Sequence, residues 1–590
     1  MLLQAYGEYN RSKAKMEDLI ARGRKIINSQ QNSILSAATL IMAMIALSLI
    51  LGFISQRVLA SYFSPDSLSL FFAAFRLPDA IFQVLVFGAF SSAFIPVFTK
   101  TLKEGRARAW LLAGKVASIG LAIFLFAVAI VGFFAVKIYA IIAPGYGPAG
   151  TAEIAFLARI LFAAQGFFVI SYVLTGVLES LRRFLVPALA PIFYNLGIIL
   201  GTVILTPYLG LTAPAVGVVI GAFAHFMIQF PLSRKLGFRF TLDLKPNEGV
   251  KDIGKLALPR VIDLAFDQLG QSVELFLSSI ISQAAYTYYT FANSLQLLPV
   301  TLFGTSLAKA VLPMLSHADG NWKEYRRILL VAIFQAMFFT LPLSAALIAL
   351  RVPAVRLVYG TKIFDWEATI ETSTTLSVFA FSIISQTLMS VLARAFFALH
   401  DTKTPVIVSF IGLFLLIAGD FVLVKGFHMD VWALAASFAF STMVEAAILL
   451  ILIDKRVGEI LNPKFFIHTL KILTAAVISG SAMFFILKIF DKSVWVKRLS
   501  FLNGVDVART FPFEKFMLDT RYTGNVIILT VVTFVVGATI YTLLSLLLRV
   551  DETKYFLNIA KSVVIKHRLP PLPPKEEEPI TQSADTQMQQ

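Results

Sequence analysis

The chain has 590 residues, of which 57% are hydrophobic and 15% are charged, and its net charge is +16. An ordinary soluble domain is about 45–50% apolar and about 25% charged, so this composition excludes a soluble multidomain enzyme and a disordered chain and indicates a polytopic helical membrane protein. We attribute the basic excess to cytoplasmic loops rather than to nucleic-acid binding. The absence of cysteine excludes disulfides, thiolate catalysis and Cys-based metal sites.

The apolar segments give a count of membrane spans. The N-terminal segment is polar and basic, and the apolar stretch after it is too long for the core of a cleavable signal peptide. A helix needs about twenty apolar residues to cross the hydrocarbon layer, and on this basis we predict fourteen spans. They lie near residues 33–56, 68–99, 112–142, 154–180, 185–206, 212–233, 256–282, 286–315, 326–350, 369–398, 404–424, 431–453, 466–490 and 522–549.

The charges of the loops predict the orientation of these spans. Basic residues follow every even-numbered span from the second to the twelfth, whereas the loops near 63–67, 143–152, 207–211 and 283–287 contain no Lys or Arg. The loops at 351–368 and 491–521 depart from this alternation, but they also contain acidic residues. By the positive-inside rule we expect both termini to be cytoplasmic, in the inner membrane of a bacterium.

Two stretches of sequence recur at nearly the same offset. Residues 170–178 resemble 384–392, and residues 87–98 resemble 303–315. Six spans fit within this offset, so the two halves have the same orientation, as in transporters that rock two lobes around a central site. We therefore predict an all-α membrane protein with two pseudo-symmetric six-helix lobes. Its parts are a basic cytoplasmic segment (1–30), an N-lobe (31–240), a C-lobe (241–456), two extra spans (457–550) and a disordered cytoplasmic tail (551–590).

Ionisable residues within the spans indicate a polar interior, because such groups usually face a bundle interior or a wet cavity. In the seventh span a polar stripe covers about 80° of the helix circumference at 100° per residue. It is either the wall of a wet pathway or a set of ion pairs that join helices, and its acids are candidates for H⁺ or Na⁺ coupling. The stripe consists of Arg260, Asp263, Asp267, Gln271 and Glu274.

Two arginines of the N-lobe are candidate ligands for a phosphate-bearing substrate, because the planar guanidinium binds phosphate oxygens in pairs. Arg76 lies in the second span beside Pro78, and its alternative role is an i,i+3 bridge to Asp79. Arg57 ends the first span, and it could instead extend to the membrane interface.

Several motifs resemble the MurJ/MviN family of lipid II flippases, which belongs to the superfamily that includes MATE multidrug exporters. The resemblance implies fourteen helices in two lobes and transfer of an undecaprenyl-pyrophosphate-linked peptidoglycan precursor to the outer leaflet. It also implies a groove for the prenyl tail near the last two spans, and a structural role for Arg394 and Asp401. The motifs are residues 51–53, 71–78, 88–96, 183–191, 258–260, 391–399 and 401–405.

The sequence departs from the family pattern where the family usually has charged residues. Ser55 and Gln56 stand in place of an Arg-Asp pair, and Asn293 and Ser294 stand in place of an acidic residue and an arginine. Phe82, Gln83 and Phe87 also replace residues that are usually charged. The resulting candidates for the substrate cleft are Arg57, Arg76, Arg260, Asn293 and Ser294.

We therefore predict a lipid II flippase that works by alternating access and is not an enzyme. The alternatives are an ion-coupled MATE-like exporter of drugs or polysaccharide lipids, and a membrane scaffold that does not transport. We expect a monomer whose partners are lipid II, or a related polyprenyl-diphosphate saccharide, and membrane lipids, without nucleic acid. We expect no cofactor apart from coupling to Na⁺, H⁺ or the membrane potential. No metal site is expected, because the six histidines never occur at ligand spacing.

Overall fold

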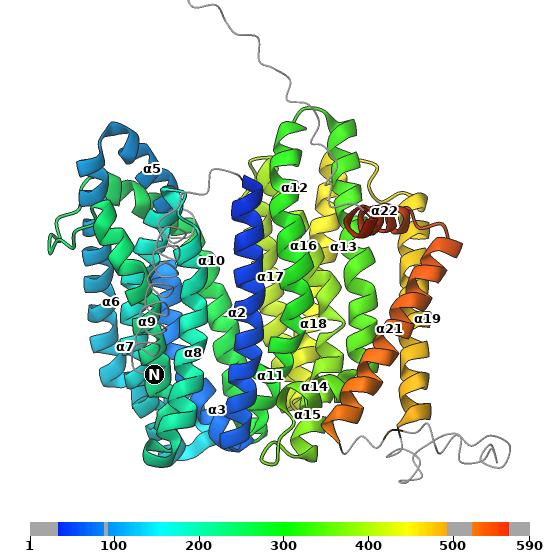
Figure 1. Cartoon of the computed structure of the whole chain (residues 1–590), viewed down its shortest axis with the longest axis horizontal. Helices are drawn as coiled ribbons and strands as arrows, with labels where there is room; N and C mark the ends of the chain where they lie inside the picture. The colour runs from blue at the N-terminus through cyan, green and yellow to red at the C-terminus, as the bar shows by residue number, and fades with distance from the viewer. Residues whose placement is uncertain (1–33, 88–92, 492–517, 519–521, 566–590) are drawn as a thin grey trace, which may run out of the picture.

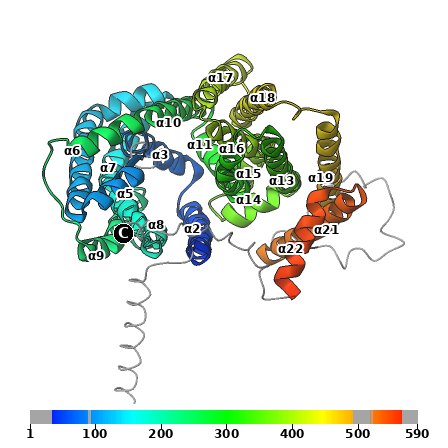
Figure 2. The ribbon, with the colours of Figure 1, turned by 90° about the horizontal axis from the view of Figure 1, so that it is seen from above.

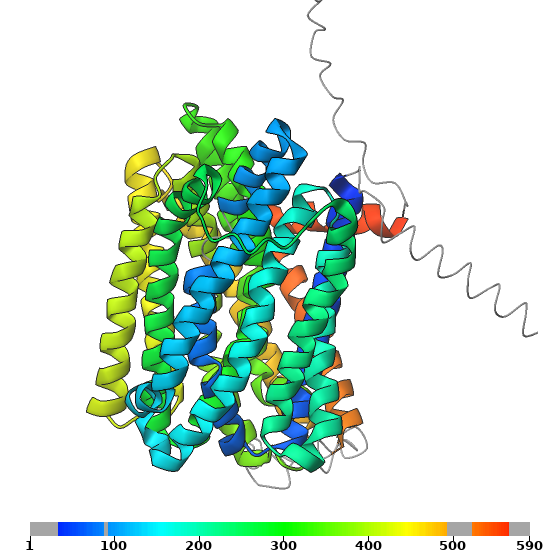
Figure 3. The same ribbon diagram turned by 90° about the vertical axis from the view of Figure 1, so that its left-hand side faces the viewer.

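The structure is a computed structural model that describes residues 34–87, 93–491, 518 and 522–565. In this part of the chain the long helices run between the same two ends of the molecule (Figures 1 and 3). Twelve helices are long and apolar enough to cross a membrane, and a pair bent by 42° makes a thirteenth span. The remaining predicted span, the seventh, is a 34-residue helix that carries the polar stripe, and at about 1.5 Å per residue it is long enough to cross. The predicted fold class is confirmed.

The helices of the predicted N-lobe begin with a long helix and a broken second span. The helices that carry Gly197 (α8) and Gly221 (α9) are in close contact, and this contact requires glycine, because a Cβ on Gly197 would lie 2.3 Å from the Cα of Gly221. The elements are α2 (Ile34–Tyr62), α3 (Pro65–Ala74), α4 (Arg76–Phe82), η1 (Gln83–Phe87), α5 (Ile95–Glu104), α6 (Arg106–Ile142), η3 (Pro144–Tyr146), α7 (Gly147–Ser180), α8 (Leu185–Leu209) and α9 (Thr212–Leu236).

The predicted C-lobe contains the polar helix and the bent pair, α15 and α16. One short helix, α14, occupies a stretch that we assigned to a loop. The elements are α10 (Glu248–Ile281), α11 (Ala285–Pro299), η4 (Val300–Thr305), α12 (Ser306–His317), α13 (Trp322–Ala349), α14 (Arg351–Tyr359), α15 (Trp366–Phe379), α16 (Ser382–Ala398), α17 (Lys403–Asp420), η5 (Phe421–Gly426) and α18 (Trp432–Val457).

The second and eighth spans are interrupted at equivalent places, in agreement with the predicted repeat. A π-helical turn, η1 or η4, interrupts each span, and a proline lies in the helix that follows, Pro96 in α5 and Pro313 in α12. A π-turn inside an α-helix shifts the faces of the two flanking segments relative to each other. Each π-turn leads into the longer of the two sequence repeats, since η1 ends at Phe87, where the segment 87–98 begins, and η4 ends at Thr305, near the start of 303–315. Residues 88–92 of this repeat lie outside the described residues.

Helix α10 packs against both halves of the molecule. Ile253 and Ala257, in its first half, belong to the same buried cluster as Trp110 of α6, whereas Leu275 and Leu277 belong to the cluster shared with α11. The strap of residues 237–247 that leads into α10 is bound to α6: Lys115 Nζ lies 2.8 Å from Asp243 Oδ2 and donates to Lys245 O over 2.9 Å. Seen from above, α10 lies beside α6 and also reaches α17 (Figure 2).

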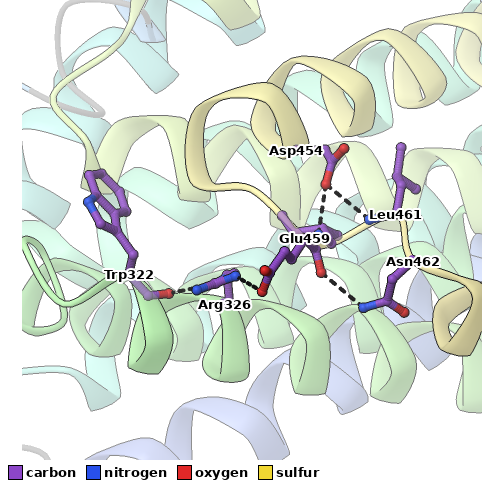
Figure 4. A network of polar contacts seen from close by, with 7 residues as sticks. Trp322, Arg326, Asp454, Glu459, Leu461 and Asn462 are labelled. Atoms are coloured by element: carbon purple, nitrogen blue, oxygen red, sulfur yellow. Dashed lines mark hydrogen bonds and ion pairs between the residues drawn. The ribbon is translucent and has the colours of Figure 1, made fainter.

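The two extra spans, α19 (Pro463–Phe490) and α21 (Thr523–Leu547), pack against α13 at one side of the molecule (Figure 2). A tight loop joins them to the C-lobe, with Gly458 and Glu459 at φ values of +79° and +54°. The carboxylate of Asp454 accepts hydrogen bonds from the backbone of Ile460 and Leu461, and Arg326 of α13 forms an ion pair with Glu459 (Figure 4). The start of α19 is thus fixed to α13 and α18.

The predicted disordered tail begins too early. Residues 551–565 form α22 (Asp551–Ile565), which lies across the end of the bundle (Figure 1). Its first turn holds Asp551 and Glu552, which suits a helix N-terminus, and Glu552 Oε2 lies 2.8 Å from His468 Nε2 of α19. Residues 1–33 and 566–590 lie outside the described residues, and the predicted division at residues 240/241 stays a prediction.

Candidate functional site

The two predicted lobes are in contact at the end of the molecule that we predict to face outside. Thr287 of α11 donates two hydrogen bonds across this seam: its N–H donates to Ser69 Oγ of α3 over 3.0 Å, and its hydroxyl donates to Pro65 O over 2.7 Å. Nearby, Gly145 N–H donates to Ser279 Oγ of α10 over 3.2 Å. A Cβ on Gly145 would lie 1.8 Å from Ser279 O, so only glycine permits this approach.

Arg76 is placed by a break in the second span. Pro78 has no N–H to donate to Ala74 O, four residues earlier, so the α-helix is interrupted there. Tyr139 of α6 compensates, because its hydroxyl donates to Ala74 O over 2.9 Å and accepts from Leu77 N–H at 3.4 Å. The break between α3 and α4 therefore has satisfied polar groups, and it directs Arg76 into the interior, where the residue is 6% exposed.

The guanidinium of Arg76 reaches across to α10. Its Nη1 donates to Gln271 Oε1 over 2.5 Å, and its Nη2 donates to Gln268 Oε1. Its Nε has no hydrogen-bond partner among the residues that the structure describes. The i,i+3 ion pair between Arg76 and Asp79, which was the alternative role for Arg76, is not formed. Asp79 Oδ1 instead accepts from Gln165 Nε2 of α7 over 2.6 Å. A full positive charge is thus held between the two predicted lobes by neutral acceptors.

Arg76 lines a cavity of about 340 Å³ together with Asp79. The cavity lies between α2, α4, α8 and α11, and its wall combines polar groups with aromatic rings. Its other lining residues are Gly52, Ser55, Gln56, Leu59, Phe71, Phe72, Phe75, Tyr194, Asn195, Ile198, Tyr286 and Thr290.

Two departures from the family pattern contact each other. Gln56 Nε2 donates to Ser294 Oγ over 3.1 Å, and Tyr359 donates to Gln56 Oε1 over 2.8 Å. A neutral hydrogen bond between α2 and α11 therefore stands where the family pattern has charged residues. Asn293 Oδ1 accepts from Gln296 Nε2 over 2.8 Å. Neither Asn293 nor Ser294 lines the cavity that contains Arg76.

Arg57 also lies away from that cavity. Its Nη1 donates to the carbonyl oxygens of Leu357, over 2.6 Å, and Val358, over 3.3 Å, near the C-terminal end of α14. Cationic groups are favourable at a helix C-terminus, so Arg57 joins α2 to α14. It lines a separate cavity at the end predicted to face outside.

Part of the acidic stripe lines a third cavity, of about 350 Å³. Asp267, Gln271 and Glu274 contribute to its wall, and Glu274 is only 6% exposed. Glu445 of α18 lies on the same wall. The side chains of Arg260 and Asp263 lie outside the described part of the chain, and only their positions within α10 are fixed.

The two motif residues of the C-lobe lie close to its loops. Asp401 accepts from the backbone N–H groups of Lys403 and Thr404, and forms a 2.5 Å ion pair with Arg456. Partial burial alone would raise the pKa of Asp401, but the hydrogen bonds from Thr404 and Arg456 outweigh it and lower that pKa below its ordinary value. The Arg394 guanidinium lies 5.4 Å from the centre of the Phe397 ring.

Sequence reasoning missed several polar residues in the interior. Gln165, Gln268 and Tyr139 complete the surroundings of Arg76, but uncharged residues did not stand out in an apolar sequence. Asp420 and Glu445 are buried acids in α17 and α18, and the rule that singled out α10 would have found them too. In the described part of the chain, no group of three His, Asp or Glu residues is arranged to hold a metal ion.

Known proteins are similar to this chain in sequence and in fold. The lipid II flippase MurJ of Burkholderia cenocepacia is 25% identical over 373 residues, which cover 61% of this chain and 72% of that protein. A solved structure of lipid II flippase MurJ in an inward closed conformation has a TM-score of 0.67 and 20% identity, covering 90% of this chain and all of that one.

A multidrug resistance MATE transporter of the MOP superfamily, solved in an inward-facing conformation, shares the fold at a TM-score of 0.57 and 17% identity. It covers 71% of this chain and 98% of its own. The family model of lipid II flippase MurJ matches residues 59–505. Since this match covers more than half of the chain, the protein belongs to the MurJ family of lipid II flippases.

Proposed function

We propose that this protein moves lipid II, the lipid-linked precursor of peptidoglycan, from the inner to the outer leaflet by alternating access. As a member of a flippase family it is a transporter and not an enzyme, and its many spanning helices make it a multi-pass membrane protein. The family match and its MurJ relatives favour this function over a drug exporter or a scaffold. We also propose that the protein lies in the inner membrane of a bacterium, that both of its termini are cytoplasmic and that it is a monomer.

The observation that carries the proposal is the position of Arg76. Its guanidinium lies on a cavity wall between the two lobes, is almost fully buried and donates to two neutral glutamine oxygens on α10. Charged acceptors make shorter and stronger hydrogen bonds with guanidinium than neutral ones do. A diphosphate that enters the cavity would therefore displace Gln268 and Gln271 from Arg76.

This exchange of partners gives a mechanism for coupling substrate to lobe movement. In the substrate-free arrangement, Arg76 joins α4 to α10 and so helps to hold the lobes together. When the diphosphate takes both donors, that connection is lost. A ligand shifts a conformational equilibrium by its difference in affinity between the two states, and here the difference arises from the Arg76 contacts.

The acids of α10 are included in the proposal as a coupling site for H⁺ or Na⁺. Asp267 and Glu274 line one cavity with Glu445, and nearby carboxylates in a poorly solvated setting favour the uptake of a cation or a proton. Transport by Asp267→Asn and Glu274→Gln variants, measured under imposed pH and Na⁺ gradients, tests this. Unchanged gradient dependence in both variants would remove the coupling role.

The main test is replacement of the native flippase of a bacterial host by this full chain. The wild type should restore growth and place lipid II in the outer leaflet, where an externally added probe detects it. Arg76→Gln should fail although folded protein is present. Arg159→Gln serves as the control, because Arg159 is an exposed residue of α7 that donates only to Gly132 O over 3.1 Å. A folded wild type that leaves lipid II in the inner leaflet would refute the function.

A further inference from the structure

A second cavity, remote from Arg76, lies at the end of the molecule predicted to face outside. It has a volume of about 500 Å³ and is bounded by the end of α2, by α14 and the segment that follows it, and by the start of α21. Its lining includes three basic side chains, those of Arg57, Arg356 and Lys362. The transport mechanism above uses none of these residues.

The cavity has an excess of positive charge. Asp365 is the acidic residue of its wall, and the Oδ1 atom of that carboxylate already accepts from Ala368 N–H over 2.9 Å as the N-cap of α15. Among the described residues, three cations and one acid line the cavity, which leaves two positive charges without a counterion from this part of the chain. Like charges that converge on one cavity repel each other, and an anion bound between them removes this repulsion.

The two arginines of the cavity are held in position by other groups of the protein. Arg57 is held by the carbonyl oxygens of Leu357 and Val358. The guanidinium of Arg356 lies 5.8 Å from the centre of the Trp366 ring, within the range of a cation–π contact. A site whose groups are already in place loses little conformational entropy when it binds a ligand.

The segment that carries Lys362 is fixed as well. The hydroxyl of Thr361 donates to Ala60 O over 2.7 Å and accepts from Phe364 N–H over 3.0 Å. This ties the segment to the end of α2. The three cations therefore come from two lobes, and hydrogen bonds join the end of α2 to the segment that carries Lys362.

The location indicates which anion would bind. Trp366 is 48% exposed, and tryptophan is enriched at the level of the lipid headgroups. Thr523 and Val526, in the first turns of α21, form another wall, so the cavity adjoins a helix with an exposed apolar face. A ligand there can place a phosphate among the basic groups and its alkyl or prenyl chain along α21.

We propose that this cavity binds the phosphate group of a lipid at the outer membrane surface. Arg57, Arg356 and Lys362 supply the charge, and Trp366 with α21 receives the apolar part. The lipid is either an anionic phospholipid of the outer leaflet or the prenyl diphosphate of the transported substrate after its release. Because Arg57 belongs to the N-lobe and the other two cations to the C-lobe, the bound phosphate stabilises the closed state of this end.

Native mass spectrometry of the purified full chain tests the proposal without any transport step, so its outcome is independent of the lipid II assay. The probes are phosphatidylglycerol and farnesyl diphosphate. The wild type should retain phosphatidylglycerol, and Arg356→Gln/Lys362→Gln should bind it at least roughly tenfold more weakly, since it loses two charge-assisted contacts. Arg351→Gln, on the same helix but outside the cavity, should bind like the wild type.

Competition between the probes identifies the source of the phosphate. Displacement of phosphatidylglycerol by farnesyl diphosphate assigns the cavity to the released substrate, and resistance to displacement assigns it to a phospholipid. Folding of each variant is checked by its thermal midpoint. Equal retention of both probes by the wild type and the double variant, or retention of neither by the wild type, would overturn the proposal.

Discussion

Replacement of Arg76 by lysine separates the charge of the guanidinium from its geometry. Arginine presents two parallel donors, which reach Gln271 Oε1 and Gln268 Oε1 on successive turns of α10. Lysine keeps the charge but concentrates its donors on a single nitrogen, so it cannot reproduce the paired contact with a diphosphate. Folding should be preserved, because lysine also donates to glutamine oxygens.

The size of the effect follows from the contacts that are lost. A hydrogen bond to a charged group contributes about 1.5–3 kcal/mol, and a change of about 1.4 kcal/mol corresponds to a factor of ten. Arg76 is only 6% exposed, so water does not replace the missing donor fully. The loss of one contact should therefore reduce transport by a factor of roughly 10 to 100.

The assay is the appearance of lipid II in the outer leaflet, followed over time in cells that depend on this chain. Protein amount and thermal midpoint are measured on the same preparations, and Arg159→Lys serves as the matched control. Wild-type rates for Arg76→Lys and Arg76→Ala together would show that the guanidinium neither binds the diphosphate nor couples the lobes.

Three further predictions concern folding and topology. Tyr139→Phe should lower the free energy of unfolding by about 1–3 kcal/mol, because Ala74 O is left without a donor beside Pro78. Denaturant unfolding measures this change with the exposed Tyr522→Phe as the control, and an unchanged denaturation midpoint for Tyr139→Phe would contradict the prediction. The pKa of Asp401 is lowered, so its carboxylate should stabilise the fold above its ordinary pKa of 3.8, and this stabilisation should be lost as the pH falls through the lowered value. The thermal unfolding midpoint, measured across that pH range, should therefore change less with pH in Asp401→Asn than in the wild type. The same change with pH in both proteins would contradict this prediction. Cysteines introduced at Gly147 and Gly210 should react with an impermeant reagent from outside, and one at Asn247 only after permeabilisation; outside labelling at Asn247 would invert the topology.

The sequence was sufficient to predict features that depend on composition and periodicity. The apolar segments follow from hydropathy, and the polar stripe of α10 follows from a step of 100° per residue. The repeat also has a structural counterpart in the two π-turns. These are local properties of the chain, and a single sequence displays them directly.

The partners of each charged residue could not be predicted, because they depend on which helices become neighbours. Arg76 was weighed against an i,i+3 bridge to Asp79, but Gln165 and Gln268, on two different helices, take the two side chains. The position of Arg57 depends on α14, which lies in a stretch assigned to a loop. The disordered tail was predicted to begin at residue 551 because of the proline-rich sequence after residue 565. That prediction overlooked the amphipathic helix α22 (Asp551–Ile565).

The attachment of α10 to α6 has a mechanical consequence. By sequence this helix opens the second repeat, yet its first half shares a buried cluster with α6 and its strap is fixed by Lys115. The six-span unit that is repeated in the sequence therefore differs from the group of helices that would move together. If the cytoplasmic half of α10 travels with the first six spans while its outer half, which carries Gln268 and Gln271, stays with α11, the bend between the lobes must lie within α10, between Ala257 and Gln268. The helix would then flex near its own middle, so the two ends of α10 would move with different lobes.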